Sequence, residues 1–220
     1  MKIEKAVRKA IPFIGCFYGR SGSGKTYSAL KFAQGLLDPE SKKNKICIID
    51  TENGRASHYA DEFNFDVINL DPPFNPLRFI EAIKMVETGN YQVLIIDSIS
   101  SEWLGTGGCY ELANETRDLK GKLLEGLNKW AKPKMQHRKM MNHILQSKLH
   151  IILCGRTKDD MEQVKKDGKT EIVNKGQVLI QEKEFEYEML TRIFLEEGGR
   201  VTIKKIHHDI KLNLKEGDCL

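Results

Sequence analysis

The chain has 220 residues, with 35 Lys and Arg against 31 Asp and Glu, so its formal charge is +4. Hydrophobic residues make up 40% and charged residues 30% of the chain, which excludes a disordered protein and is typical of a folded domain with a buried core. No apolar run approaches the roughly 20 residues that a membrane-spanning helix needs. The charged N-terminal segment has no signal-peptide core, so we expect a cytoplasmic protein with no membrane partner.

The cysteine content agrees with a reducing compartment. There are five cysteines and no CxxC pair, which predicts neither a zinc site nor a disulfide framework. Cys16, Cys47 and Cys154 lie in short apolar runs, so we expect buried thiols that pack as small hydrophobic groups. His207 and His208 have no partner ligands at metal spacing, and we expect no metal there.

Apolar segments alternate with helical patterns along the first 155 residues. Strands are expected at residues 13–18, 45–50, 65–70, 92–97 and 149–154. Helices are expected at residues 25–37 and 77–87, and from about 109 to 147. Because the strands are continuously apolar rather than alternating, both faces of their sheet should be covered. The pattern predicts an α/β fold with a mainly parallel sheet flanked by helices.

The C-terminal part has a different pattern. Residues 157–176 are polar and predict a loop. Residues 191–196 and 200–206 resemble two strands, and the glycine pair between them predicts a β-hairpin. With no repeat and no low-complexity linker, the chain is predicted to form a single domain over residues 1–220.

A phosphate-binding motif follows the first expected strand. Residues 19–26 read GRSGSGKT and match G-x-x-x-x-G-K-[ST] at every fixed position. Glycines allow the backbone N–H groups to approach phosphate oxygens, and the helix that begins at Lys25 directs its positive end at the same anion. Lys25 should reach the β- and γ-phosphates, and the Thr26 hydroxyl should ligate Mg²⁺. The predicted phosphate-binding residues are Gly19, Arg20, Ser21, Gly22, Ser23, Gly24, Lys25 and Thr26.

Two carboxylates compete for the second position of the metal site. Residues 93–97 are four aliphatic residues followed by Asp97, and residues 46–50 are four apolar residues followed by Asp50. Asp97 is the better candidate, because Asp50 is followed two residues later by a second carboxylate, Glu52. Glu52 should lie at the carboxyl edge of the sheet, where it could activate a water for attack on the γ-phosphate. The alternative for Glu52 is a capping acid at the start of the next helix.

The segments FYGRSGSGKT, ICIIDTENGR and VLIIDSIS, in this order, resemble the RecA-like core ATPases. The closer resemblance is to the short RecA-like ATPases of bacteriophages, of the Sak single-strand annealing type. It rests also on DTENGRASHYAD, CGRTKDD and FEYEML and covers residues 10–206. The resemblance implies ATP as the nucleotide, Mg²⁺ as the metal, Glu52 as the hydrolytic base and Asp97 as the Walker B carboxylate. It also implies a homo-oligomer with ATP near a protomer interface, in the host cytoplasm if the chain is phage-encoded.

Arg156 departs from the RecA pattern, in which a glutamine ends the strand after Walker B. An arginine there could contact the γ-phosphate and stabilise charge in the transition state. It could instead pair with Asp159 or Asp160.

The resemblance places DNA-contacting segments within residues 100–148 and 157–176. Residues 115–148 contain nine Lys and Arg against three Asp and Glu, and Trp103, Tyr110, Trp130 and His137 lie in or near this stretch. Cations and aromatic faces are typical of single-strand binding. The alternative is a helix with a solvated basic face and a core Trp130.

The expected function is a Mg²⁺-dependent ATPase of phage DNA recombination that binds or anneals single-stranded DNA. The alternative is a nucleotide-gated loader or switch of a phage replication or packaging complex, without direct DNA binding. A small-molecule kinase is disfavoured, because no arginine-rich lid is evident.

Overall fold

The fold is built on one mainly parallel sheet. The computed structural model describes residues 4–7, 11–43, 45–166 and 169–205. The strand order is β3-β2-β4-β5-β1-β7-β8, and β6 pairs with β5 outside this path. The strands in this order are β3 Asp66–Asn69, β2 Lys45–Asp50, β4 Tyr91–Asp97, β5 His150–Lys166, β1 Ile14–Gly19, β7 Thr191–Leu195 and β8 Val201–Lys205.

The parallel register brings residues of four strands, β1, β2, β4 and β5, level with one another at one edge of the sheet. All neighbours from β3 to β7 are parallel, and only the β7–β8 pair in this path is antiparallel. Asp50 at the end of β2 is level with Asp97 at the end of β4, and Gly19 at the end of β1 is level with Arg156 on β5. The residues predicted to act on phosphate therefore share one edge.

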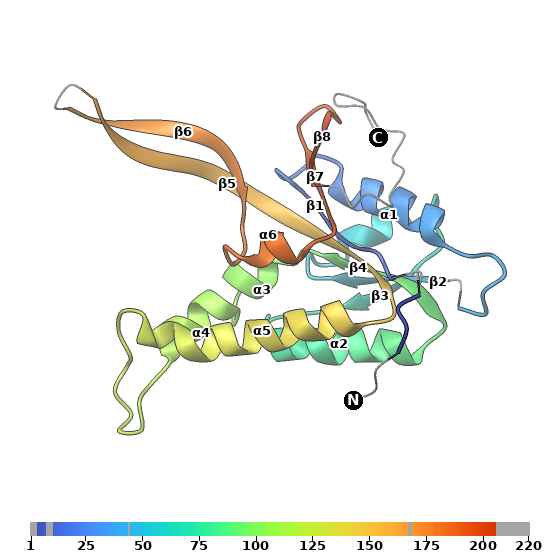
Figure 1. Ribbon diagram of the computed structural model, residues 1–220, viewed down its shortest axis with the longest axis horizontal. Helices are drawn as coiled ribbons and strands as arrows, with labels where there is room; N and C mark the ends of the chain where they lie inside the picture. Colours follow the sequence, from blue (N-terminus) through green and yellow to red (C-terminus); the bar gives the residue numbers. More distant parts are fainter. Residues whose placement is uncertain (1–3, 8–10, 44, 167–168, 206–220) are drawn as a thin grey trace.

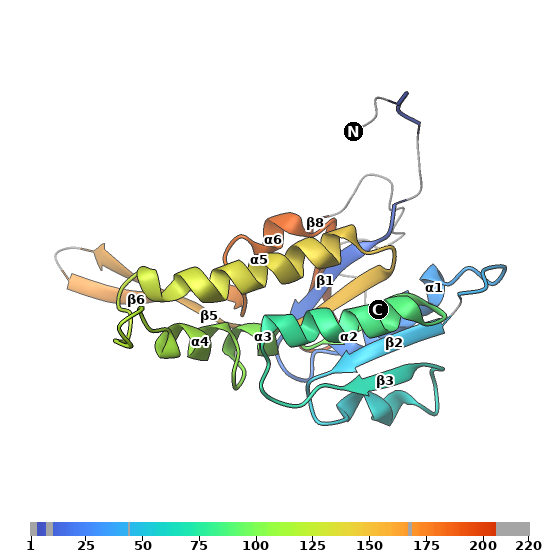
Figure 2. The ribbon, with the colours of Figure 1, turned by 90° about the horizontal axis from the view of Figure 1, so that it is seen from below.

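Helices cover both faces of the sheet, as the continuously apolar strands predicted. α1, Lys25–Leu36, lies on one face, and α2, Pro76–Thr88, and α5, Ala131–Gln146, lie side by side on the other (Figures 1 and 2). Each helix buries one stripe at helical spacing. The stripe residues are Ala29, Leu30 and Ala33 in α1, Phe79, Ala82, Ile83 and Val86 in α2, and Met140, Met141 and Ile144 in α5.

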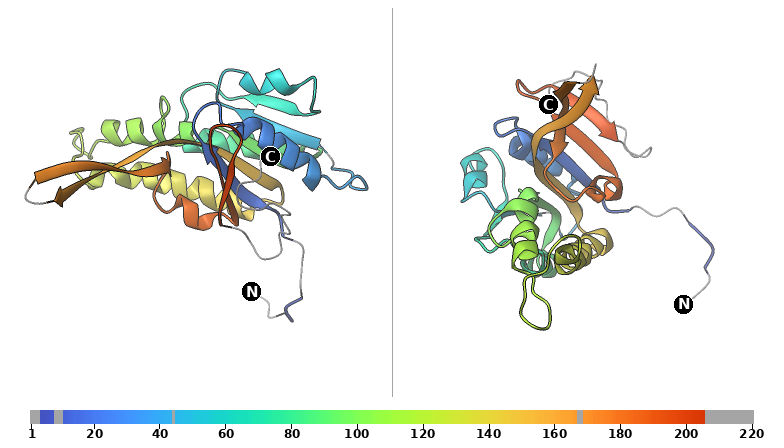
Figure 3. Two further views of the ribbon diagram at one scale, coloured as in Figure 1. Left: turned by 90° about the horizontal axis from the view of Figure 1, so that it is seen from above. Right: turned by 90° about the vertical axis from the view of Figure 1, so that its left-hand side faces the viewer.

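The segment between β4 and β5 contains helices, as predicted from about residue 109 to 147, but they are separated by a long irregular stretch. It contains α3, Ser100–Leu104, and α4, Cys109–Glu115, followed by an irregular stretch, a 3₁₀ turn at Asn128–Trp130 and then α5. α4 ends at Glu115, because Thr116 is extended, and Gly121 and Gly126 in the irregular stretch have left-handed φ values of 81° and 60°. The stretch projects as a loop beyond α4 (Figures 1 and 3).

The polar segment after the fifth strand is an arm, not the predicted loop. β5 continues past the sheet to Lys166 and pairs antiparallel with β6, Lys169–Leu179. The pairing begins where Thr157 lies opposite Leu179. This hairpin projects from the body of the molecule (Figure 1). Most of its described side chains are exposed, so its sequence shows no alternation of apolar and polar residues. The two strands are held by backbone pairing instead.

The predicted C-terminal β-hairpin is confirmed. β7 and β8 pair through Leu195 and Val201, and Glu196 N–H donates to the Arg200 carbonyl at 2.9 Å across the turn. A short helix, α6 Phe185–Glu188, precedes it. Residue 206, the predicted end of the hairpin, lies outside the described residues, as do the two histidines at 207 and 208.

Two further expectations concern cysteines and membranes. Cys16, Cys47 and Cys154 are buried free thiols, as predicted, and Cys109 is a fourth. Across the described ranges, no helix combines the length and apolar character needed to cross a membrane.

Candidate nucleotide-binding site

The loop between β1 and α1 has the backbone geometry of a phosphate cradle. Gly22 and Gly24 have φ values of 82° and 84°, a region that L-residues rarely adopt. Gly19 approaches β7 so closely that an added Cβ would lie 2.2 Å from the Leu195 carbonyl oxygen. Glycine is therefore required at these positions by the shape of the loop, and the helix N-terminus that follows faces the cradle.

Lys25 and Ser23 direct polar groups into this loop. The Lys25 side chain is buried, and its ammonium donates to the carbonyls of Arg20 at 2.7 Å and Gly19 at 3.2 Å. An ammonium has three donors, so one remains for a phosphate oxygen. The Ser23 hydroxyl is also buried and has no hydrogen-bond partner in the described part of the chain. Both groups fit a bound phosphate.

The hydrogen bonds of the two candidate metal carboxylates, Asp97 and Asp50, differ. Thr26 Oγ1 donates to Asp97 Oδ2 at 2.5 Å, so the two predicted metal ligands lie together. Asp50 instead accepts hydrogen bonds from the backbone N–H groups of Glu52 at 2.5 Å and Ala56 at 2.9 Å. A hydroxyl beside a carboxylate suits Mg²⁺, which prefers oxygen ligands. The site fits a magnesium ion held by Thr26 and Asp97, whereas Asp50 stabilises the turn after β2.

The Asp97 carboxyl is destabilised in its charged form. Burial raises its pKa to about 6, and the nearby charges of Glu52 and Asp50 add to this, while the Thr26 hydrogen bond and the Lys25 charge oppose it. A carboxyl group with a raised pKa at a phosphate site is typical of a functional residue, because its ionised form lowers the stability of the fold.

We expect Asp97→Asn to stabilise the protein without nucleotide or metal. The raised pKa corresponds to on the order of 2 to 3 kcal/mol at pH 8. The ionised Asp97 lowers the free energy of unfolding only while the folded protein keeps the carboxyl group deprotonated. This loss of stability should therefore shrink as the pH falls from about 6 towards 4. Thermal unfolding of both proteins at pH 8 and at pH 5 measures this. Asp61→Asn, an exposed acid, is the control and should shift neither curve; a lower melting temperature for Asp97→Asn at pH 8 contradicts the prediction.

Glu52 lies at the same edge and is held by two arginines. Its Oε1 contacts Arg156 Nη2 at 2.6 Å and Nε at 2.8 Å, and its Oε2 contacts Arg55 Nη1 at 3.2 Å. The alternative role as a helix cap is wrong, because the 3₁₀ turn Arg55–Tyr59 begins after Gly54, and Asp50 binds the N–H of Ala56. The Glu52 side chain is thus available for chemistry once the arginines release it, which keeps its role as base a prediction.

The structure corrects one alternative for Arg156. Asp159 binds Arg20 of the phosphate loop at 2.8 Å, whereas Arg156 pairs with Glu52. Ser100 Oγ, at the start of α3, accepts a hydrogen bond from the backbone N–H of Arg156 at 2.9 Å. This bond holds the start of the arm beside α3. Contact of Arg156 with a γ-phosphate stays a prediction.

Sequence reasoning missed three partners in this site. Arg55, Ser100 and the ion pair of Arg20 with Asp159 were not expected. Arg55 follows Glu52 by three residues, a spacing that places both side chains on one side of a turn and could have been noticed. Ser100 and Asp159 contact residues 56 and 139 positions away, and no local pattern predicts such pairs.

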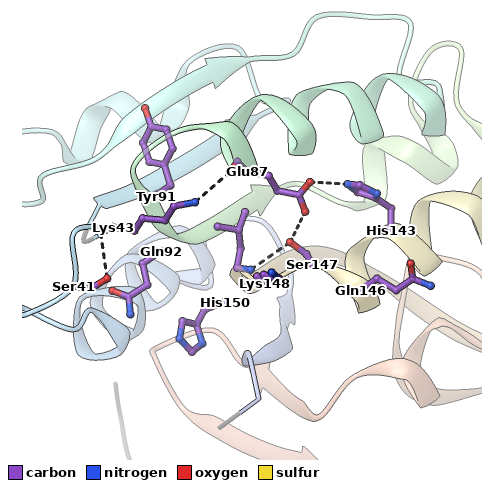
Figure 4. Close-up of a pocket in the computed structure, with 11 residues that line it drawn as sticks. Ser41, Lys43, Glu87, Tyr91, Gln92, His143, Gln146, Ser147, Lys148 and His150 are labelled. Atoms are coloured by element: carbon purple, nitrogen blue, oxygen red, sulfur yellow. Dashed lines mark hydrogen bonds and ion pairs between the residues drawn. The ribbon is translucent and has the colours of Figure 1, made fainter. Parts of the chain in front are cut away.

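One pocket of the described chain lies away from this edge of the sheet. A pocket of about 660 Å³ lies at the amino ends of β4 and β5 (Figure 4). Glu87 there binds Ser147 Oγ at 2.6 Å and His143 Nε2 at 3.1 Å. Because the P-loop is at the carboxyl ends of the parallel strands, this pocket takes no part in the phosphate site.

Comparisons with known proteins identify a family and a fold. A family model described as an AAA domain matches residues 12–208. Among solved structures, the chain is similar to a KaiC-like protein, PH0186, from the hyperthermophilic archaeon Pyrococcus horikoshii OT3, with a TM-score of 0.52 and 16% identity. That match covers 91% of this chain and 82% of the other. A comparison with curated proteins found no match.

The structural match shows the fold, which is the predicted RecA-like P-loop fold. The specific likeness to phage annealing ATPases is not tested by these matches and stays a prediction. With the family model spanning nearly the whole described chain, the protein belongs to the AAA domain family of nucleotide-binding P-loop proteins.

Proposed function

We propose that this protein is a Mg²⁺-dependent ATPase that binds or anneals single-stranded DNA in phage recombination. The ATPase part is supported by the P-loop, the Thr26–Asp97 pair and Glu52 at one sheet edge. The DNA part is carried by one observation, an aromatic groove that begins directly after the Walker B strand. As in other RecA-like cores, we expect a homo-oligomer with ATP near a protomer interface.

In this proposal each residue of the site has a defined task. Lys25 binds the β- and γ-phosphates, and Thr26 and Asp97 hold the metal. Mg²⁺, when bound, supplies neutralisation of phosphate charge. Glu52 accepts a proton from the attacking water, which requires its ion pair with Arg156 to open. Arg156, once free, can reach phosphate charge from the strand next to the P-loop strand.

The groove offers flat aromatic surface. Trp103 of α3 and Trp130 before α5 are stacked with ring centroids 5.6 Å apart and an angle of 15° between planes. Tyr110 packs edge-on against Trp130 at 5.8 Å. The groove has a volume of about 1100 Å³ and extends to the base of the arm. Trp130 is half-buried rather than a core residue, so part of its side chain is exposed in the groove.

Charge around the groove is unevenly placed. Its own walls are balanced, with three lysines, Lys134, Lys158 and Lys183, against three acids, Asp160, Glu182 and Glu186. The basic excess lies beside it, in exposed residues of the loop and the first turns of α5, namely Arg117, Lys120, Lys122, Lys132, Arg138 and Lys139. We therefore expect bases to stack in the groove and phosphates to follow the flanking basic loop.

Titration of a fluorescent single-stranded oligonucleotide, with and without ATP and Mg²⁺, tests the proposal. We expect the logarithm of the binding constant to fall linearly with the logarithm of the salt concentration. Trp130→Ala should lower the affinity about tenfold, because base stacking contributes roughly 1 to 3 kcal/mol. Tyr187→Ala, an exposed aromatic outside the groove, is the matched control and should bind as the unmodified protein does. No binding at low salt contradicts the DNA proposal.

A second candidate function is favoured by the loop after α4. Leu119 and Leu127 are almost fully exposed there, and Leu123 is a little under half exposed. Exposed leucines on one loop suit contact with a protein rather than with phosphates. This supports the alternative of a nucleotide-gated loader in a phage replication or packaging complex. ATP hydrolysis without any oligonucleotide binding would favour this candidate over the first.

A further inference from the structure

Three buried side chains of the kinds that can ligate a metal lie together on the helices between β4 and β5. Glu102 of α3, Cys109 of α4 and His137 of α5 are all buried, and Glu102 and Cys109 have no exposed surface. Glu102 Oε1 lies 3.0 Å from Cys109 Sγ and 3.1 Å from His137 Nδ1. The three side chains come from separate helices, so the fold, rather than a short motif, brings them together.

The distances are close to those of a tetrahedral zinc site. All three ligand atoms lie within 4.8 Å of one another. Zinc bonds of about 2.0 Å to oxygen and nitrogen and 2.3 Å to sulfur place neighbouring ligands about 3.3 to 3.5 Å apart. The observed separations from Glu102 Oε1 are a few tenths of an ångström shorter. Small side-chain shifts would therefore admit an ion, and mixed thiolate, imidazole and carboxylate ligands favour Zn²⁺ over Mg²⁺.

The surroundings hold the ligands in place. Gln181 Nε2 donates to the second Glu102 oxygen at 3.1 Å and to the Ile99 carbonyl at 3.2 Å. The Trp103 ring packs edge-on against the His137 ring at 5.7 Å and covers it. Hydrogen bonds from a second layer to a ligating carboxylate are usual in metal sites, because they fix its orientation.

Charge and proton balance are consistent with an ion here. In the metal-free protein the Cys109 thiol donates to Glu102 Oε1. On binding, Zn²⁺ displaces the thiol proton, and any proton on His137 Nδ1, to solvent. The result is one thiolate, one carboxylate, a neutral imidazole and a doubly charged cation. This buried set has no net charge, which suits a site removed from water.

We propose that Glu102, Cys109 and His137 bind one Zn²⁺ ion that joins α3, α4 and α5. This site is separate from the phosphate site and from the magnesium pair, and it stands independently of the DNA proposal. By tying α3 and α4, which carry Trp103 and Tyr110, to α5, which begins directly after Trp130, the ion would fix the wall of the aromatic groove.

Purification of the full chain without chelators or a histidine tag, followed by elemental analysis and Co²⁺ substitution, tests the site. We expect about one zinc per chain, a sulfur-to-cobalt charge-transfer band in the Co²⁺ protein, and a lower melting temperature after chelation. The band reports a thiolate ligand, which separates this site from an oxygen-only magnesium site. Absence of zinc together with absence of the band overturns the proposal.

Variants locate the ion. Cys109→Ser should lose the band, whereas Cys47→Ala, which removes another buried thiol, should retain it. Persistence of the band in Cys109→Ser overturns the assignment. If Cys109→Ser fails to fold, a variant with His207, His208 and Cys219 changed to alanine provides an independent test. It should keep the band, and its loss there would assign the metal to the C-terminal segment and overturn the proposal.

Discussion

Lys25→Ala is expected to lower the affinity for ATP by roughly 100-fold, because it removes a buried, charged donor to the phosphates. The P-loop backbone should keep its shape, since glycines and not the lysine set the left-handed turns. Isothermal titration with ATP and Mg²⁺ measures the change. A melting curve in the absence of nucleotide should show that the variant is folded.

Lys31→Ala is the matched control for this prediction. Lys31 is on the same helix, is exposed, and lies 5.8 Å from the centre of the Tyr27 ring, away from the loop carbonyls that hold Lys25. It should bind ATP as the unmodified protein does. Equal ATP affinity of Lys25→Ala and Lys31→Ala would show that the loop binds phosphate without its lysine, against the role given to it here.

Glu52→Gln is expected to keep ATP affinity and to lose turnover by about 10² to 10⁴-fold, the usual contribution of a general base. The amide keeps the size of the side chain and can still accept a hydrogen bond from Arg156, so the fold of the edge should persist. It cannot take a proton from water. Phosphate release under multiple turnover, with ATP affinity measured separately, tests this.

The control for Glu52→Gln is the same change at Glu81, an exposed position on α2. Glu81→Gln should hydrolyse ATP at the unmodified rate. If Glu52→Gln also hydrolyses ATP at that rate, Glu52 is not the base, and its role reduces to the ion pairs with Arg156 and Arg55.

How far the sequence predicts this structure depends on whether a residue's partner is local. The central strands were foreseeable because each is a continuous apolar run, and β4 is buried from Val93 to Asp97 as the pattern implies. The phosphate loop was foreseeable because glycines at fixed spacing meet the demands of its backbone. Both signals lie within ten residues of chain.

Features that join distant segments were not foreseeable in the same way. The arm of β5 and β6 was predicted as a loop, since its side chains are mostly solvated and leave no hydrophobic period. The Arg156–Glu52 pair joins residues 104 positions apart, and sequence offered Asp159 as a nearer but wrong partner. The cluster at Glu102 has no recognisable ligand spacing, because its members come from three helices whose packing alone brings them together.

The course of β5 has a mechanical consequence. One strand runs from the centre of the sheet, past Arg156, into the arm, and its residues 157–166 extend roughly 33 Å beyond the sheet edge at about 3.3 Å each. Asp159 at the base is tied to Arg20 of the phosphate loop. Because β5 pairs with the strand that leads into the phosphate loop, and its arm is tied to that loop, we expect a tilt of β5 beside the phosphates to displace the tip of the arm further than its base.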